Sequence, residues 1–456
     1  MSGVDEVLKY IATNEIKWID LQFFDIKGFM HRTTISNKQI DDKLFEKGID
    51  AADLTKVFGK SEQGELVLVP DPDTMARIPW EPSTIRFLCD VRVADKNERF
   101  LKDSRYVAER TESNIEAIGA KSMLVGADVE FNIFDSATTD RTTPGRGGGT
   151  LIESREAPWS PTTLAGFEKG SFIATPFDTM YGARAQIAET MEESFGVTID
   201  GHRHGRSKMG QQMLDIQEYP VKMAADALTS VKYVARSLGN AVNASVTFMP
   251  YPIDGETGNS LNIHQSIWKA SDKNVFYDGE DNYAQISQTA RYYIGGILEH
   301  TPALTFLTNP TTNSYRRLAA DPKTVGWSKE DRNAVVRVPT VKKNYKETKR
   351  ITYTLADPSV NPHLAYSAII AAGLDGVKNK IEPGYPTESS KESKKKKIEL
   401  PMGLYQSIEA FGSDSKFLKG LVPKEIVEEL VDLKYEEIKN SSKSIPAWEM
   451  AKYFNI

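Results

Sequence analysis

Residues 123–134 read MLVGADVEFNIF, and we predict a β-strand over them. Asp128 and Glu130 are two positions apart, so both carboxylates project from the same face of this strand. Two acids on one face could bind a hard divalent cation through oxygen, or they could pair with nearby arginines. Two carboxylates do not complete a six-coordinate shell, so a metal site would need further ligands from elsewhere in the chain.

The residues before this strand divide into a helix and a small α+β unit. The helix is predicted from Asp103 or Ser104, which can cap it, to about Ile118. Residues 1–102 combine a short helix with alternating segments that are typical of strands. The helix is expected at 4–12, and the strands at 18–24, 30–35, 66–69 and 85–91. We therefore place a domain boundary between residues 102 and 103.

The residues after the strand are mostly helical. Helices are predicted at 182–195, 221–239, 282–300, 360–378 and 422–454. The polar stretch 138–161 is predicted to be a loop, and its Gly145–Gly149 run lacks the Lys-Ser/Thr of a phosphate-binding loop. The segment SSKESKKKK at 389–397 is interpreted as a solvated loop, with binding of an anionic partner as the less favoured alternative.

Composition indicates a soluble globular protein. The chain has 456 residues, of which 40% are hydrophobic, and 57 Lys and Arg stand against 63 Asp and Glu. This mildly acidic balance gives no electrostatic footprint for nucleic acid. The single cysteine, Cys89, excludes an intrachain disulfide and a multi-cysteine zinc site. No signal sequence or run of about 18 apolar residues occurs, so we expect a cytoplasmic protein with no membrane or nucleic-acid partner.

Two further clusters carry candidate chemistry. Guanidinium groups suit the recognition of carboxylate or phosphate, and structural ion pairing is an equal alternative. The arginines concerned are Arg316, Arg317, Arg332 and Arg337. His202 and His204 would share one face of a strand, but Arg203 and Arg206 beside them disfavour a bound cation.

Several stretches closely resemble the type I glutamine synthetase family. The longest is IGGILEHTPALTFLTNPTTNSYRRL at 294–318. The others are WIDLQFFDIKGFMHRTTIS (18–36), LVLVPDPDT (66–74), GADVEFNIF (126–134) and ADPSVNPHLAYSAIIAAGLDGVKNKIEPG (356–384). They follow the family's order along the chain. The resemblance implies an α+β fold with an N-terminal β-grasp domain at 1–102. A large catalytic-type domain with a curved antiparallel sheet and helices would occupy 103–456.

The family makes glutamine from glutamate, ammonia and ATP, with two or three Mg²⁺ or Mn²⁺ ions held by carboxylates and one histidine. The resemblance implies that Asp128 and Glu130 retain two of the six metal-ligand positions. At the other four positions, Gly205, Met213 and Thr352 replace acids, and Asn262 replaces the histidine. Asparagine and threonine could offer only weak neutral oxygens, so most of the cation-binding groups are missing.

Other matched positions differ in what they retain. Thr354 replaces a phosphate-contacting arginine, and Lys323 aligns with a glutamate that accepts a proton from ammonium. The ammonium-site turn is not recognisable near 51–55, and Asp50 and Asp53 are the candidate substitutes. The anion-binding positions remain. Gly258, Arg317 and Arg332 match substrate-binding residues, and His264, Ser266 and Arg337 match nucleotide-binding residues.

The sequence therefore predicts a divergent family member that has lost normal metal-dependent glutamate–ammonia ligation. It would act as a binding, regulatory or co-assembling paralogue of an active glutamine synthetase, with a small anionic ligand and no assigned catalytic residue. The alternative is an active ATP-dependent ligase that joins ammonia or another amine to glutamate or a related acid. Only this alternative requires ATP with Mg²⁺ or Mn²⁺. The resemblance also implies a homo-oligomer, a dodecamer of two hexameric rings.

Overall fold

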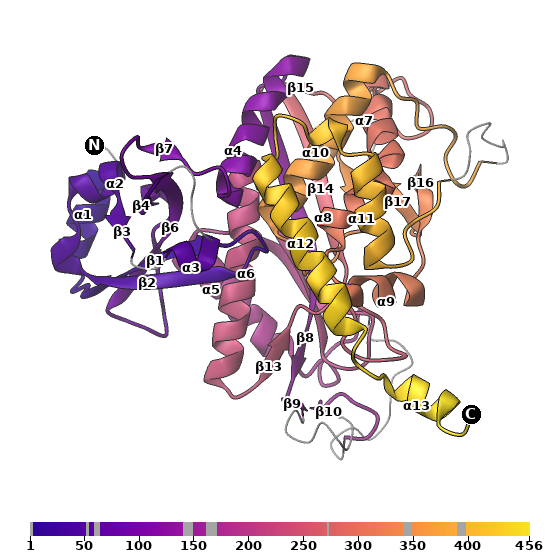
Figure 1. The fold of residues 1–456 in the computed structure, drawn as a ribbon, viewed down its shortest axis with the longest axis horizontal. Coiled ribbons are helices and arrows are strands. Elements are labelled where there is room, and N and C mark those ends of the chain that lie inside the picture. The colour runs from indigo at the N-terminus through magenta and orange to yellow at the C-terminus, as the bar shows by residue number, and fades with distance from the viewer. Residues whose placement is uncertain are drawn as a thin grey trace.

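The computed structural model describes residues 3–51, 54–58, 64–139, 149–160, 171–270, 273–340, 348–389 and 398–456. A smaller N-terminal part stands beside a larger body, and the C-terminal helix projects away from that body (Figure 1). Each part has its own β-sheet and its own main cluster of buried apolar side chains. The predicted α+β fold is confirmed.

The N-terminal sheet is built around the predicted hairpin of β1 (Trp18–Phe24) and β2 (Met30–Ser36). Strand β1 also pairs in parallel with β6 (Thr84–Val93), which is the longest strand of this sheet. Helix α1 (Gly3–Thr13) contributes buried Val7 and Ile11 to the apolar cluster of this part. The remaining elements are β3 (Ile49–Asp50), β4 (Leu66–Pro70), β5 (Ala76–Arg77), β7 (Glu98–Arg99), α2 (Asp42–Lys47) and α3 (Leu54–Phe58).

The sheet of the larger part has the strand order β11-β12-β8-β14-β18-β17-β16 in the described residues. These strands are β11 (Ile199–His204), β12 (Gln211–Pro220), β8 (Ser122–Phe134), β14 (Leu261–Ala270), β18 (Ile351–Tyr353), β17 (Ala334–Arg337) and β16 (Thr324–Ser328). Neighbours along this order are antiparallel except β16 and β17. Two short strands, β13 (Ser245–Thr247) and β15 (Lys273–Asn274), pair with β8 and β14.

The two faces of this sheet differ in character. Val125, Val129 and Ile133 of β8 are buried in the main apolar cluster, which includes side chains of the helices. These helices include α6 (Val221–Ala241), α7 (Gln288–Glu299) and α10 (Pro362–Asn379). Because side chains alternate along a strand, the residues between them, including Asp128 and Glu130, face the opposite side.

Most predicted helices are present, with local differences at their ends. Helix α4 (Ser104–Asn114) begins as predicted, because the Asp103 carboxylate accepts a hydrogen bond from the Arg105 backbone. The predicted helix at 282–300 begins only at Gln288, where Ser287 caps it. The other helices are α5 (Tyr181–Phe195), α8 (Thr301–Thr308), α9 (Thr312–Ala320), α11 (Leu404–Ser413), α12 (Lys424–Ser441) and α13 (Ala447–Tyr453).

Two sequence interpretations need correction. The region 422–454 is not helical throughout. Helix α12 ends at Ser441, and Pro446, which cannot continue a helix, lies just before α13. The predicted loop at 138–161 includes strand pairing between β9 (Ser136–Thr139) and β10 (Thr150–Glu153). Residues 140–148 and 390–397 lie outside the described residues, as do most of the glycine run and most of the basic segment.

A buried ion cluster joins the two parts of the molecule. Arg105 of α4 lies within 3.0 Å of Asp71 and 2.7 Å of Asp90, and within 2.8 Å of Asp226 on α6. Farther along the junction, the Asn361 amide donates to the Ile26 carbonyl at 3.1 Å. In the parts of the chain that the structure describes, no helix has both the length and the apolar character needed to cross a membrane.

Candidate functional site

The strand registers bring most of the predicted site residues onto the polar face of the large sheet. Residues directly opposite in antiparallel strands have their side chains on the same side. Met213 of β12 lies opposite Glu130, and Asn262 of β14 lies opposite Asp128. The prediction that Asp128 and Glu130 share a face is therefore confirmed, and two of the replaced ligand positions lie beside them.

The same face continues across the next two strands. His264 of β14 lies opposite Thr352 of β18, and Thr352 lies opposite Arg337 of β17. The sequence positions assigned to metal and nucleotide thus lie beside each other on neighbouring strands. We call this surface the polar sheet face. It comprises Asp128, Glu130, Met213, Asn262, His264, Thr352 and Arg337.

Asp128 is already bound by a protein side chain. The His264 ring contacts the Asp128 carboxylate through Nε2 at 2.8 Å, and its Nδ1 lies 2.9 Å from the Thr352 hydroxyl. Burial alone would raise the pKa of Asp128, but the charges of His264, Arg350 and Arg203 outweigh it and lower the pKa. The protein itself therefore supplies the groups that stabilise this carboxylate in its charged form.

Glu130 also has internal partners. Its Oε2 accepts hydrogen bonds from the Ser260 backbone and the Ser260 hydroxyl, both at 2.7 Å. The side chain is buried, with 4% of the residue exposed. Ser260 therefore engages one of the two carboxylate oxygens of Glu130.

The space next to Gly205 is occupied by Gln211. A Cβ placed on Gly205 would lie 2.5 Å from Gln211 Cγ, closer than real Cβ contacts allow. Gln211 is held there because its amide donates to the Gly258 carbonyl at 3.1 Å and to Asn259 at 3.0 Å. A longer side chain at position 205 would therefore require Gln211 to move.

The donor set on the polar sheet face does not fit the family's divalent cations. Mg²⁺ and Mn²⁺ prefer several hard oxygen ligands, usually carboxylates. Met213 is a buried thioether, and Asp128 and Glu130 are engaged by His264 and Ser260. Within the described ranges, no group of three or more His, Cys, Asp or Glu side chains is arranged to hold a metal ion.

Cationic groups surround this face. Arg203 pairs with Asp215 at 2.5 Å, and Arg350 approaches Glu218 at 3.4 Å. Arg337 is half-buried, and its Nε has no hydrogen-bond partner among the described residues. Burial lowers the pKa of Arg337, and the nearby charge of Arg332, which is itself exposed, lowers it further. Guanidinium groups such as that of Arg337 suit the binding of an anion.

Arg317 is almost fully buried. It is 1% exposed and donates through Nη2 to the Leu355 carbonyl. Gly258 packs against it, since a Cβ at Gly258 would lie 2.7 Å from Arg317 Cγ and 2.5 Å from the Pro250 carbonyl. The structure therefore brings Gly258 and Arg317 together, while Arg332 and Arg337 are the more open of the predicted arginines.

Lys323 belongs to a second group of charges beside Arg317. Its ammonium lies 3.5 Å from Asp321, which also contacts Arg206 at 3.3 Å. Burial lowers the pKa of Lys323, and Arg206 and Arg317 add to this effect against the attraction of Asp321. The position assigned to a family glutamate thus lies in positively charged surroundings.

The remaining predicted positions have local partners or cannot be placed. Ser266 donates to Glu218 at 3.0 Å and accepts from the Trp268 indole at 3.0 Å. Thr354 donates to the Ala334 carbonyl at 2.9 Å. Asp50 ends β3 and is exposed, and Asp53 lies outside the described residues.

Glu156 is a site-edge residue that the sequence interpretation missed. It lies 3.0 Å from His204 Nε2, and it accepts hydrogen bonds from the Gly210 backbone at 2.9 Å and the Thr179 hydroxyl at 2.7 Å. His204 therefore has a carboxylate partner. The sequence offered no signal for this contact, because 48 positions separate the two residues.

Comparisons with known proteins agree with the motifs. Residues 15–94 match the family model described as glutamine synthetase, beta-Grasp domain, and residues 101–453 match glutamine synthetase, catalytic domain. A glutamine synthetase of Sulfolobus acidocaldarius is 37% identical over 448 residues, which cover 95% of this chain and 94% of the relative. A glutamine synthetase of Vibrio cholerae is 31% identical over 481 residues, which cover 100% of this chain and 100% of the relative.

Other similar proteins have different names or only a similar fold. A 3-hydroxylaminophenol mutase of Cupriavidus pinatubonensis is 31% identical over 477 residues, covering 100% of this chain and 99% of the relative. The glutamine synthetase structure from Plasmodium falciparum has a TM-score of 0.89 at 22% identity, covering 99% of both chains. At this identity, the structural likeness establishes the fold and leaves the reaction to be argued from the site.

Proposed function

The chain belongs to the glutamine synthetase family, and we propose that its function departs from the family's metal-dependent reaction. The polar sheet face binds a small anion through the protein's own cationic side chains, and the chain does not carry out normal glutamate–ammonia ligation. The observation that carries this proposal is the state of the two retained acids. Asp128 is bound by His264, and Glu130 is bound by Ser260.

The charge balance supports this proposal. Phosphoryl transfer from ATP gathers negative charge that metal ions normally offset, and a divalent pair needs several carboxylate ligands. Here the neighbouring strand positions carry Met213, Asn262 and Thr352. Three arginines interact electrostatically with Asp128. Arg203 and Arg350 lower the pKa of Asp128, and Asp128 in turn acts to raise the pKa of Arg337. Arg203 and Arg350 are paired with Asp215 and Glu218, so Arg337 is the arginine of the three that remains for an anion.

The test is calorimetric titration of the purified protein with Mn²⁺, with ATP, and with both together. We expect no mutually dependent binding of Mn²⁺ and ATP in the low-micromolar range. ATP or inorganic phosphate should bind in the presence of EDTA, and Arg337→Met should weaken this binding about tenfold or more, as expected for loss of a charge-assisted hydrogen bond. The exposed Lys439→Met variant is the control. Tight Mn²⁺-dependent ATP binding by the unaltered chain would refute the proposal.

A companion experiment restores the missing ligands. The variant that combines Gly205→Glu, Met213→Glu, Asn262→His and Thr352→Glu should bind Mn²⁺ more tightly than the unaltered chain. Gly205→Glu has a steric cost, because Gln211 occupies the adjoining space. The triple variant without Gly205→Glu therefore serves as the matched control. Equal Mn²⁺ affinity in all three proteins would show that the replaced positions do not determine cation binding.

The second candidate is an active ATP-dependent ligase for glutamate or a related acid. It is favoured by the Sulfolobus acidocaldarius relative, which bears the name glutamine synthetase and is 37% identical. This candidate predicts phosphate release from ATP that depends on glutamate and on Mg²⁺ or Mn²⁺. We expect phosphate release near zero under these conditions, and glutamate-dependent release would establish the ligase instead.

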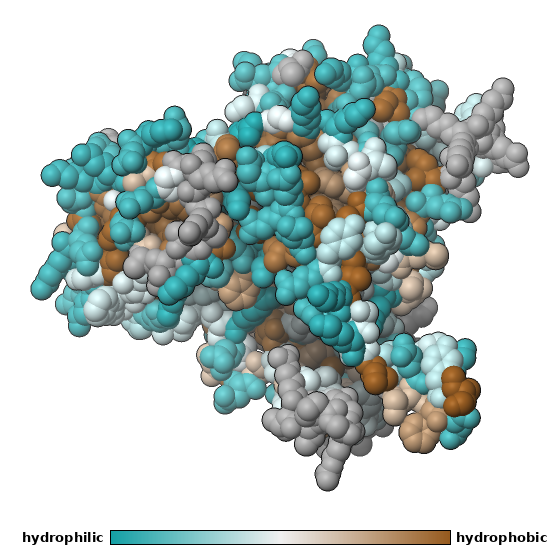
Figure 2. Space-filling model, viewed as in Figure 1, coloured by the Kyte–Doolittle hydropathy of each residue, from teal (hydrophilic) through white to brown (hydrophobic). Residues whose placement is uncertain are grey.

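We further propose that the chain forms a homo-oligomer, with a dodecamer as the expected size and an active glutamine synthetase as a possible co-assembly partner. Apolar side chains near the C-terminus support self-association, since α13 extends from the body and exposes apolar surface (Figures 1 and 2). These side chains are Trp448, Met450, Phe454 and Ile456. Light scattering of the full chain tests this, and a monomeric mass would contradict it. A chain ending at residue 444 tests the role of these side chains, and an unchanged oligomer would show that they are not needed.

A further inference from the structure

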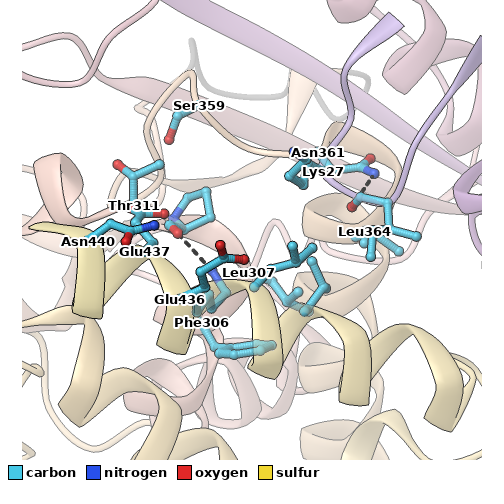
Figure 3. A pocket seen from close by; sticks show the side chains of 15 residues that line it. Lys27, Phe306, Leu307, Thr311, Ser359, Asn361, Leu364, Glu436, Glu437 and Asn440 are labelled. Carbon is cyan, nitrogen blue, oxygen red and sulfur yellow. Dashed lines mark hydrogen bonds between the residues drawn. The ribbon is translucent and has the colours of Figure 1, made fainter. Parts of the chain in front are cut away.

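A cavity lies beneath α12, outside the polar sheet face. It has a volume of about 320 Å³ and is enclosed by α12, the connection from α8 to α9, and the 359–364 segment (Figure 3). Its volume is within the range of about 300–1,000 Å³ that is usual for small-molecule sites. The walls combine polar side chains with an apolar part. The apolar part includes Ile26, Phe306, Leu307, Leu364, Leu430 and Leu433.

Lys434 is the buried cation of this cavity. Only 4% of the residue is exposed, although lysine is rarely buried without a charged partner. Its ammonium donates to the Pro310 carbonyl at 2.8 Å and lies 4.7 Å from the centre of the Phe306 ring. It forms no ion pair with a carboxylate in the portion of the chain that the structure describes. An ammonium has three donors, so the Pro310 carbonyl leaves hydrogen-bonding capacity unused.

The surrounding charges do not compensate Lys434. Burial lowers the pKa of Lys434 to about 7, and the more distant charges of Glu437 and Asp357 only partly oppose this effect. An isolated charge in an apolar environment is unfavourable, and an anion at hydrogen-bond distance would remove most of that penalty. The cavity therefore offers volume, partly apolar walls and a buried ammonium whose hydrogen-bond acceptor is a neutral carbonyl.

The acids at the mouth have other partners or face solvent. Glu437 accepts a hydrogen bond from the Thr312 backbone at 2.8 Å, at the beginning of α9. Glu436 is exposed, and so is Lys27, which lines the same cavity. These two opposite charges are in contact with water, where their effect is screened. Lys434 is thus the buried one among the charged side chains that line the cavity.

We propose that this cavity binds a small carboxylic acid with an apolar body. The carboxylate would pair with Lys434, and the body would pack against Phe306, Leu430 and their apolar neighbours. This site is separate from the proposed anion site on the polar sheet face, and it does not depend on that proposal. Its wall includes Pro310 and Thr311, which immediately precede α9, the helix that carries Arg317.

The test is calorimetric titration of the full chain with 3-phenylpropionate and with its neutral analogue, 3-phenylpropionamide. We expect the acid to bind at least tenfold more tightly than the amide. Lys434→Met should keep the length and apolar character of the side chain but remove this preference for the acid. Lys439→Met, an exposed substitution on the same helix, should leave both affinities unchanged.

Two further variants separate this site from the arginines of the polar sheet face. Binding of 3-phenylpropionate should persist in Arg332→Met and in Arg337→Met, because neither residue lines the cavity. The proposal is overturned if the acid does not bind, if it binds no better than the amide, or if its binding is unchanged in Lys434→Met. It is also overturned if Arg337→Met abolishes binding while Lys434→Met does not.

Discussion

Arg105 and Lys434 are both buried cations, but their surroundings are opposite. Arg105 lies among Asp71, Asp90 and Asp226, all within 3.0 Å. Burial alone would lower the pKa of Arg105, but the charges of Asp226, Asp90 and Asp71 outweigh it and raise the pKa. Lys434 has a carbonyl and an aromatic ring as its near partners, and its pKa falls to about 7.

This difference distinguishes a buried charge that stabilises the fold from a buried charge that a ligand could contact. The Arg105 cluster joins residues of the N-terminal part to α6, and its members satisfy one another. At Lys434 the protein provides a cavity where the second charge would be. A buried charge with internal counter-charges thus indicates a structural role, whereas a buried charge that lines a cavity without an ion-pair partner is consistent with our proposal of a bound anion.

The largest expected effect comes from breaking the Arg105 cluster with Asp226→Ala. Asp226 accepts from Arg105 at 2.8 Å and contacts His363 at 2.9 Å, so its loss leaves two buried groups without a main partner. Removing one member of a buried ion pair typically lowers the free energy of unfolding by about 3–5 kcal/mol. Urea unfolding at fixed protein concentration measures this change.

The control for Asp226→Ala is Glu428→Ala on the surface of α12. Glu428 pairs with Lys424 at 2.8 Å, and both side chains are largely exposed. We expect no measurable change in unfolding, because water and salt screen such a pair. If Asp226→Ala were as mild as this control, the remaining acids Asp71 and Asp90 would be sufficient for Arg105.

The opposite sign is expected for Lys434→Met. Replacing an uncompensated buried cation by an apolar side chain of similar length should raise the free energy of unfolding by about 1–2 kcal/mol near neutral pH. The unfolded chain binds more protons at Lys434 between pH 7 and 10.5, so the stability of the unaltered protein rises with pH across this window. The advantage of the variant should therefore shrink toward pH 10.5.

Urea unfolding at several pH values measures this trend, with the exposed Lys439→Met as the control. A constant difference between the unaltered chain and Lys434→Met would mean that the lysine keeps its usual pKa in the folded state. A loss of stability would mean that the hydrogen bond to Pro310 and the Phe306 contact outweigh the desolvation of the charge.

Local patterns were sufficient to predict much of the fold. The alternation in β8 placed Asp128 and Glu130 on one face, and the β1–β2 hairpin lies at the predicted residues. Both depend on short-range periodicity, which the sequence displays directly. The break at Pro446 also has a local cause, because proline lacks the donor that a continuing helix needs.

The site was less predictable, because its decisive features depend on contacts between distant segments. Nothing local to Glu156 indicates that it would contact His204, 48 positions later. The family resemblance matched Arg317 to a substrate-binding position, but it gave no sign that Gly258 would pack against this side chain and that it would be buried. Lys434 did carry a local signal. Ile426, Leu430 and Lys434 recur every four residues, which places the lysine on the buried face of α12.

The smallest expected effect concerns His300, which is intermediate between Arg105 and Lys434. Its Nδ1 lies 2.8 Å from Asp414 and its Nε2 lies 3.1 Å from Asp375, so a doubly protonated ring satisfies both acids. Burial would lower the pKa of His300, but the hydrogen bonds and charges of Asp414 and Asp375 outweigh it and raise the pKa. This contribution to stability is fully present below the unfolded pKa of 6.5 and is lost as pH rises through the folded pKa.

Asp414→Asn should therefore lower the free energy of unfolding by about 0.5–1 kcal/mol near pH 5.5, with little difference near pH 8.5. The effect is modest because 38% of the Asp414 side chain is exposed and its charge is screened. Unfolding at the two pH values measures it, and Asp432→Asn, at an exposed position of α12, is the control. An equal loss at both pH values would show that Asp414 stabilises the fold without help from a protonated His300. His300 would then not be intermediate between Arg105 and Lys434.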